Sequence, residues 1–143
     1  MKAFILAILL IGFKVSAQSN NYIMLAPNVA FDVKASDPKN LFGITLEVGR
    51  YFGDYAVGIN SGYYSVDKRD LYSELMETAP IYGPFTVSIA AGWFYYKKDI
   101  TMEYDINYSF ATRNGYTPIV AYSVQTAFGT SCKAFSIGIN KDF

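Results

Sequence analysis

Apolar and polar side chains alternate one by one along most of the chain after residue 20. The clearest case is residues 101–111. One parity is apolar (Met102, Tyr104, Ile106, Tyr108 and Phe110), and the other is polar or small (Thr101, Glu103, Asp105, Asn107, Ser109 and Ala111). Successive side chains of a strand point to opposite faces, whereas a helix with 3.6 residues per turn would mix the two sets. The pattern therefore predicts a strand with one apolar and one polar face.

Six other segments show the same alternation and are also predicted to be strands. They are residues 21–33, 41–51, 55–65, 85–96, 116–128 and 133–143. Turn-forming residues separate them, at Phe52-Gly53-Asp54, Tyr82-Gly83-Pro84 and Arg113-Asn114-Gly115 on one end and at 37–40, 67–69, 97–99 and 129–131 on the other. Pro27 interrupts the first segment and predicts a seam or bulge, because proline donates no hydrogen bond to a sheet.

Residues 70–80 allow two interpretations. The segment could be a strand, but Asp70 followed by Leu71, Leu75 and Ala79 also reads as a capped helical turn with a spacing of four residues. A closed membrane barrel made by one bacterial chain normally has an even number of strands. We therefore favour a strand, which brings the predicted number of strands to eight.

The composition of the two faces indicates which one is inside. The polar face consists mostly of Gly, Ala, Ser, Thr and Asn, which fit a narrow barrel, whereas a face in water would carry many Lys and Glu. Aromatic residues on the apolar face fall toward the segment ends, at Tyr55, Tyr63, Phe85, Trp93, Tyr95, Tyr104, Phe110, Tyr116, Phe128, Phe135 and Phe143. Aliphatic residues lie mostly between them, which predicts two aromatic girdles around a membrane-spanning band.

A soluble alternative has the opposite orientation. A secreted barrel of the lipocalin kind also has eight strands, but it turns its apolar side inward around an apolar ligand. The charges on the apolar parity, Arg50, Lys133 and Lys141, lie near segment ends, where long side chains can reach a membrane surface. This placement favours the membrane interpretation.

The first residues read as a signal peptide. Lys2 precedes the apolar residues 3–13, and Val15-Ser16-Ala17 forms a small-residue cleavage site. The apolar stretch is too short for a membrane-spanning helix, which needs roughly 17–25 residues. We therefore expect a signal peptide at residues 1–17 and one mature domain at residues 18–143.

The composition excludes several functions. The chain has no histidine, so a Ser-His-Asp triad, a Cys-His pair and a His-containing zinc site are impossible. Twelve basic residues balance twelve acidic ones, which argues against a nucleic-acid partner. Cys132, in a predicted external loop, is the only cysteine and cannot form an internal disulfide. We expect neither a cofactor nor enzymatic activity.

These features together resemble a known family. The Ala17-Gln18 junction, the turn and strand at residues 51–58 and the closing segment that ends at Phe143 are similar to small eight-stranded outer-membrane β-barrels of Gram-negative, Bacteroidota-like bacteria. The resemblance implies an all-β, antiparallel, up-and-down transmembrane barrel in the outer membrane. It also implies contact with outer-membrane lipids, recognition of the last strand by the barrel assembly machinery, and a structural or interaction role at the cell envelope.

Four polar residues are candidates for a site inside the barrel. Glu47, Glu103, Asp105 and Asn107 share the predicted interior parity. Buried carboxylates need partners, and Lys34, Arg69 or Lys98 would have to reach them from loops. One interpretation is a cation-binding or narrow ion-conducting lumen. The other is a set of structural carboxylates, hydrogen-bonded to neighbouring Tyr, Asn and Thr side chains or solvated near the rim.

Overall fold

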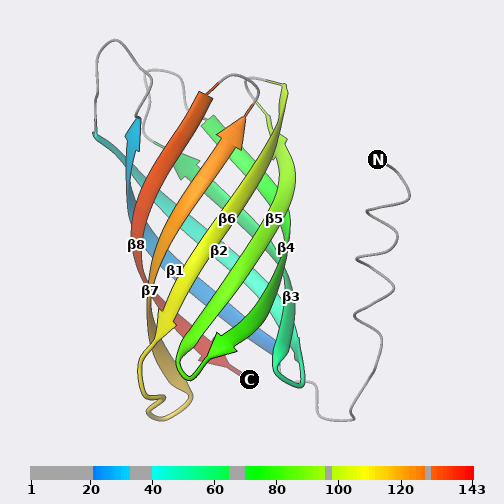
Figure 1. The fold of residues 1–143 in the computed structure, drawn as a ribbon, viewed down its shortest axis with the longest axis vertical. Coiled ribbons are helices and arrows are strands. Elements are labelled where there is room, and N and C mark those ends of the chain that lie inside the picture. Colours follow the sequence, from blue (N-terminus) through cyan, green and yellow to red (C-terminus); the bar gives the residue numbers. More distant parts are fainter. Residues whose placement is uncertain (1–20, 33–39, 65–69, 96–97, 128–129) are drawn as a thin grey trace.

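Eight antiparallel strands form a closed barrel in the computed structural model, which describes residues 21–32, 40–64, 70–95, 98–127 and 130–143. Each strand pairs with its neighbours in sequence, and the last pairs with the first (Figure 1). The strands are β1 (Asn21–Asp32), β2 (Asn40–Phe52), β3 (Tyr55–Tyr64), β4 (Asp70–Tyr82), β5 (Phe85–Phe94), β6 (Asp99–Ser109), β7 (Tyr116–Ala127) and β8 (Thr130–Asp142). The predicted all-β up-and-down barrel is confirmed.

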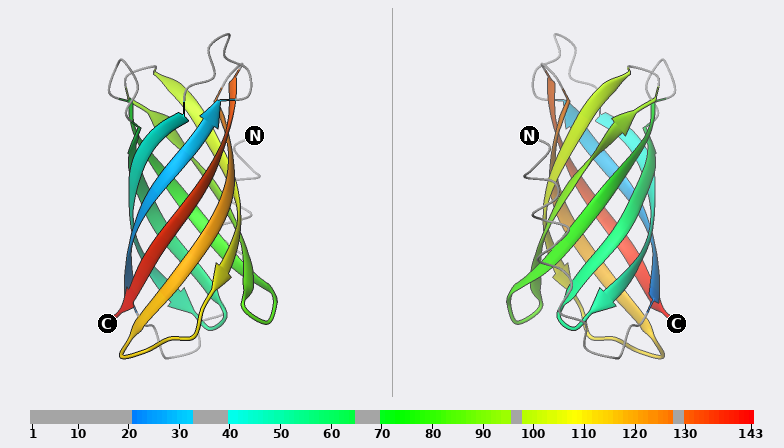
Figure 2. Two further views of the ribbon diagram at one scale, coloured as in Figure 1. Left: turned by 90° about the vertical axis from the view of Figure 1, so that its left-hand side faces the viewer. Right: turned by 90° about the vertical axis from the view of Figure 1, so that its right-hand side faces the viewer.

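The strands are strongly tilted, as Figure 2 shows. Following the paired residues once around the barrel from Tyr22 leads back to β1 at Asp32, ten residues further along the strand. With a rise of about 3.3 Å per residue and about 4.7 Å between strands, this stagger corresponds to a tilt of about 40°. A barrel of this geometry has a narrow interior that side chains can fill.

The ambiguous segment at residues 70–80 is a strand. β4 pairs with β3 and β5 over most of its length. Leu71 and Leu75 are exposed on the outer surface, while Tyr72 and Glu74 are buried. The preference for a strand over a helical turn is therefore confirmed.

Pro27 lies at the seam where the barrel closes. The pairing of β1 with β8 includes Leu25 with Ile139 and resumes at Asn28 with Ser136. Pro27 itself is paired only with Ile44 of β2. The predicted interruption is confirmed, because the proline falls where the ladder between the first and last strands is broken.

Three connections lie at the barrel end where β1 begins and the chain ends (Figure 1). Gly53 and Gly83 have positive φ angles of 67° and 55°, as tight turns require. The third connection is longer than predicted, because β6 stops at Ser109 and only an isolated bridge joins Arg113 to Tyr116. The signal peptide and the predicted turns at 37–39, 67–69, 97 and 129 lie outside the described residues.

The apolar face is outside and the polar face is inside. Ile106 and Ile137 are 54% and 67% exposed on the exterior, whereas Glu103 is only 5% exposed. This arrangement excludes the lipocalin-like alternative, which requires apolar side chains around an internal ligand. Within the described residues, no helix is long and apolar enough to cross a bilayer.

The aromatic girdles need two corrections. Tyr104 lies at the middle of β6, and Phe135 lies near the middle of β8 because this strand begins at Thr130, earlier than expected. Phe135 packs against Tyr122 of β7, with ring centroids 5.0 Å apart. Cys132 was also misplaced, since it lies in β8 and packs against buried Tyr72 and its neighbours.

Candidate functional site in the barrel interior

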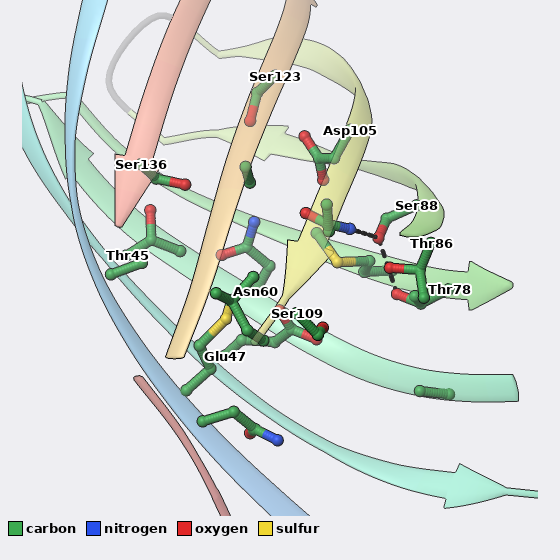
Figure 3. A pocket seen from close by; sticks show the side chains of 18 of the residues that line it. Thr45, Glu47, Asn60, Thr78, Thr86, Ser88, Asp105, Ser109, Ser123 and Ser136 are labelled. Carbon is green, nitrogen blue, oxygen red and sulfur yellow. Dashed lines mark hydrogen bonds between the residues drawn. The ribbon is translucent and has the colours of Figure 1, made fainter. Parts of the chain in front are cut away.

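A cavity of about 160 Å³ occupies the part of the interior nearer the end with the three described connections. Side chains from all eight strands line it, and several of them converge on it in Figure 3. It reaches this end of the barrel, because its lining includes the exposed turn residue Asp54 and also Ser109 at the end of β6. The lining is predominantly polar or small, as expected from the sequence.

All four polar residues singled out in the sequence line this cavity. Glu47 comes from β2, and Glu103, Asp105 and Asn107 come from β6. Glu47, Glu103 and Asp105 are buried, while Asn107 is half-buried. The structure therefore brings the four side chains to one cavity.

Asn107 belongs to a small hydrogen-bonded group on the cavity wall. Its side-chain amide donates to Ser88 Oγ at 2.8 Å, and Ser88 Oγ lies 2.8 Å from Thr78 Oγ1 (Figure 3). These bonds join β4, β5 and β6 through side chains, in addition to the backbone ladder. They indicate a structural role for Asn107.

Glu47 is held by a tyrosine. The hydroxyl of Tyr22 donates a hydrogen bond to Glu47 Oε1, and the Tyr22 ring packs against Tyr51 with centroids 4.7 Å apart. Asn140 in turn donates to Tyr51 Oη at 2.9 Å. One carboxylate oxygen of Glu47 therefore has a hydrogen-bond partner inside the protein, as the interpretation of the interior carboxylates as structural groups predicts.

A buried layer closes the interior beyond the cavity. Glu74 Oε1 accepts hydrogen bonds from Thr101 Oγ1 at 2.8 Å and Gln125 Nε2 at 3.1 Å. Tyr72, at the next inward-facing position of β4, packs against Phe94 with centroids 5.4 Å apart. None of these five side chains lines the cavity, so they form a closing layer across the lumen.

The sequence reasoning missed Glu74 and Tyr72. Both lie in the segment whose secondary structure was ambiguous, so their parity was not interpreted. Placing Leu71 and Leu75 on the apolar face would have assigned both residues to the interior. The alternation of residues 70–80 therefore contained the information, but it could be used only once the segment was taken as a strand.

The interior is rich in hydrogen-bond acceptors and has no buried cation among the described residues. All described lysines and arginines are exposed or half-buried, and Lys141 lies over the Tyr116 ring at 4.3 Å. Lys98 is exposed, while Lys34 and Arg69 lie outside the described residues. In this part of the chain, no group of three His, Cys, Asp or Glu side chains is arranged to hold a metal ion.

Comparison with known proteins supports the fold. No family model and no curated protein sequence matches the chain. The chain is similar in structure to Neisserial surface protein A, with a TM-score of 0.61 and 11% identity over 86% of this chain and 97% of the other. It is equally similar to Ail, the attachment invasion locus protein of Yersinia pestis (TM-score 0.61, 12% identity, 88% and 99% coverage).

The N-terminal β-barrel domain of Pseudomonas aeruginosa OprF is a third neighbour, with a TM-score of 0.54 and 11% identity over 88% of this chain and 100% of the other. At such low identity the likeness concerns the fold, so no residue role is transferred. The chain has the eight-stranded barrel fold of small outer-membrane proteins.

Proposed function

We propose that this chain is an integral outer-membrane β-barrel of a Gram-negative bacterium with a non-catalytic structural or interaction role at the cell envelope. The observation that carries the proposal is the predominantly apolar exterior of a closed barrel. Contact of this apolar surface with water would be unfavourable. In a bilayer the acyl chains of the lipids cover it, and the backbone groups stay satisfied because they are already paired between strands. A Bacteroidota-like origin remains a prediction from the sequence.

Outer-membrane lipids are the proposed partners of the exterior. Ile59, Ile106 and Ile137 are more than half exposed on it. The exposed side chains of Arg50 and Lys133 lie toward opposite ends of their strands, within reach of the lipid headgroups. This distribution suits a band of acyl chains between two polar surfaces.

The final strand is the proposed signal for the barrel assembly machinery. Phe143 is exposed, and its backbone exchanges hydrogen bonds with Asn21 at 2.9 and 3.1 Å. We expect Phe143→Ala to lower the amount of folded protein in the outer membrane several-fold without lowering the stability of refolded protein. Phe110→Ala, which removes an exposed aromatic ring from the connection after β6, is the matched control. Equal losses for the two variants would argue against a recognition role for Phe143.

Fractionation of the expressing bacterium tests the location. We expect recovery in the outer-membrane fraction and a band that migrates faster in detergent gels before heating than after it, because the folded barrel resists the detergent. Recovery in the soluble fraction would contradict the proposal.

A further inference from the structure

The cavity presents unused hydrogen-bond acceptors. Four buried side-chain oxygens of residues that line it have no hydrogen-bond partner: Asn28 Oδ1, Asn60 Oδ1, Asp105 Oδ1 and Asn140 Oδ1. Asn60 and Asn140 are each 2% exposed, and Asp105 is 5% exposed. Buried polar atoms are normally satisfied, so four acceptors around one space indicate an occupant that provides positive charge or donors.

Two carboxyl groups lie beside these acceptors. Glu103 Oε2 accepts a long hydrogen bond of 3.4 Å from Asn60 Nδ2, which places the Asn60 amide next to the carboxylate. Glu103 also lies within electrostatic range of Asp105, its neighbour on the interior face of β6, and of Glu74 in the closing layer. No described lysine or arginine is buried, so no basic side chain in this part of the chain pairs with these carboxyl groups.

Within the described residues, the cavity lining reaches only one end of the barrel. Its lining extends to Asp54 and Ser109 at the end where β1 begins and the chain terminates. In the other direction Tyr72, Glu74 and Thr101 are at most 1% exposed and block the lumen. An ion could therefore enter and leave at the same end without crossing the barrel.

We propose that the cavity is a blind binding site for one small monovalent cation, held by the carboxylates of Glu103 and Asp105 and by the amide oxygen of Asn60. The cation neutralises the two acidic groups and occupies the space lined by the residues that carry the unused acceptors. Water fills the remaining volume, but water alone leaves the carboxylates without a counter-charge.

The arrangement favours a monovalent over a divalent ion. Mg²⁺ demands near-ideal octahedral geometry, and protein Ca²⁺ sites gather 6–8 oxygen ligands that include several carboxylates. The described residues contain no cluster of three acidic side chains positioned to hold a metal ion. Two carboxylates and neutral amide oxygens suit a weakly held ion such as Na⁺ or K⁺.

Thermal unfolding of the full-length mature protein in neutral detergent tests the site. The unfolding midpoint is measured in NaCl, KCl and N-methylglucamine chloride at equal ionic strength, so that only the size of the cation changes. We expect Na⁺ or K⁺ to raise the midpoint by about 5 °C at ten times the dissociation constant, relative to the bulky organic cation.

Charge-neutralising variants locate the effect. Asp105→Asn and Glu103→Gln are nearly isosteric, and each should abolish the difference between the small and the bulky cation. Glu77→Gln removes one negative charge from the outer face of β4. It should keep the difference in midpoint between the small and the bulky cation, because Glu77 does not line the cavity.

Three results would overturn the proposal. The first is that the unmodified protein has the same unfolding midpoint in all three salts. The second is that the cation effect on the midpoint survives in Asp105→Asn and Glu103→Gln. The third is that Glu77→Gln abolishes the cation effect as well. The comparison of salts with the unmodified protein decides even if a variant does not fold. A barrel that folds in detergent and shows no cation effect would refute the site and leave the proposed outer-membrane role untouched.

Discussion

Glycines determine how closely strands and side chains approach inside this barrel. A methyl group at Gly49 would lie 2.4 Å from Cζ of Tyr22, so the ring that holds Glu47 needs this glycine beneath it. At Gly92 the neighbour is backbone, because a methyl group there would lie 1.9 Å from the carbonyl oxygen of Ser73. A side chain can move aside, but a paired strand cannot.

Gly92→Ala should therefore be strongly destabilising. We expect it to lower the free energy of unfolding by about 3 kcal/mol, because β4 and β5 must separate to admit the methyl group. Gly138→Ala is the matched control, since its methyl group would lie 3.1 Å from the Ala26 side chain and should cost about 1 kcal/mol or less. Urea unfolding in phospholipid vesicles measures both, and equal costs would contradict the close strand approach.

β4 shows where the sequence was informative and where it was not. Leu71, Leu75 and Ala79 recur every four residues, a spacing that suits both one face of a strand and one side of a helix. The local pattern could not distinguish a strand from a helix, and the need for an even number of strands decided in favour of the strand. Alternation also predicted which residues face inward, but not which residues meet. The partners of Glu74 lie 27 and 51 residues away and depend on the stagger of the whole barrel.

The two glutamates of β4 should respond differently to truncation. Glu74→Ala leaves buried Thr101 and Gln125 without their acceptor and should lower the unfolding free energy by about 2 kcal/mol. Glu77→Ala, on the opposite face of the same strand, should change it by about 0.5 kcal/mol or raise it, because a charge is removed from the apolar exterior. Denaturant titration of both variants in vesicles checks this, and an equal loss would contradict the assigned faces.

At the scale of the whole molecule, the barrel has an apolar exterior and a polar interior, and the closing layer fills the lumen beyond the cavity. Its closing layer bears on the narrow-channel alternative, because Tyr72 and Phe94 pack together on the far side of the cavity. Eight strands leave an interior that side chains just fill, so removing large ones should open a path.

Planar-bilayer recordings test this closure. The unmodified protein should show no steady conductance, whereas the double variant Tyr72→Ala with Phe94→Ala should conduct cations through the acidic interior. The single exterior variant Tyr104→Ala, which removes an aromatic ring from the lipid-facing surface, should remain silent. Steady cation conductance of the unmodified protein would show that the closing layer does not seal the lumen.

The contact of the exterior with acyl chains is the central claim, and quenching of tryptophan fluorescence by brominated lipids tests it most directly. Trp93, the only tryptophan, is 41% exposed near the end of β5, while Ile106 lies near the middle of β6. We expect bromines near the headgroups to quench the fluorescence of Trp93 most strongly. A second protein carries Ile106→Trp in a Trp93→Phe background, and we expect bromines deep in the acyl chains to quench its single indole most strongly. Absence of quenching by lipid bromines at both positions would contradict the account.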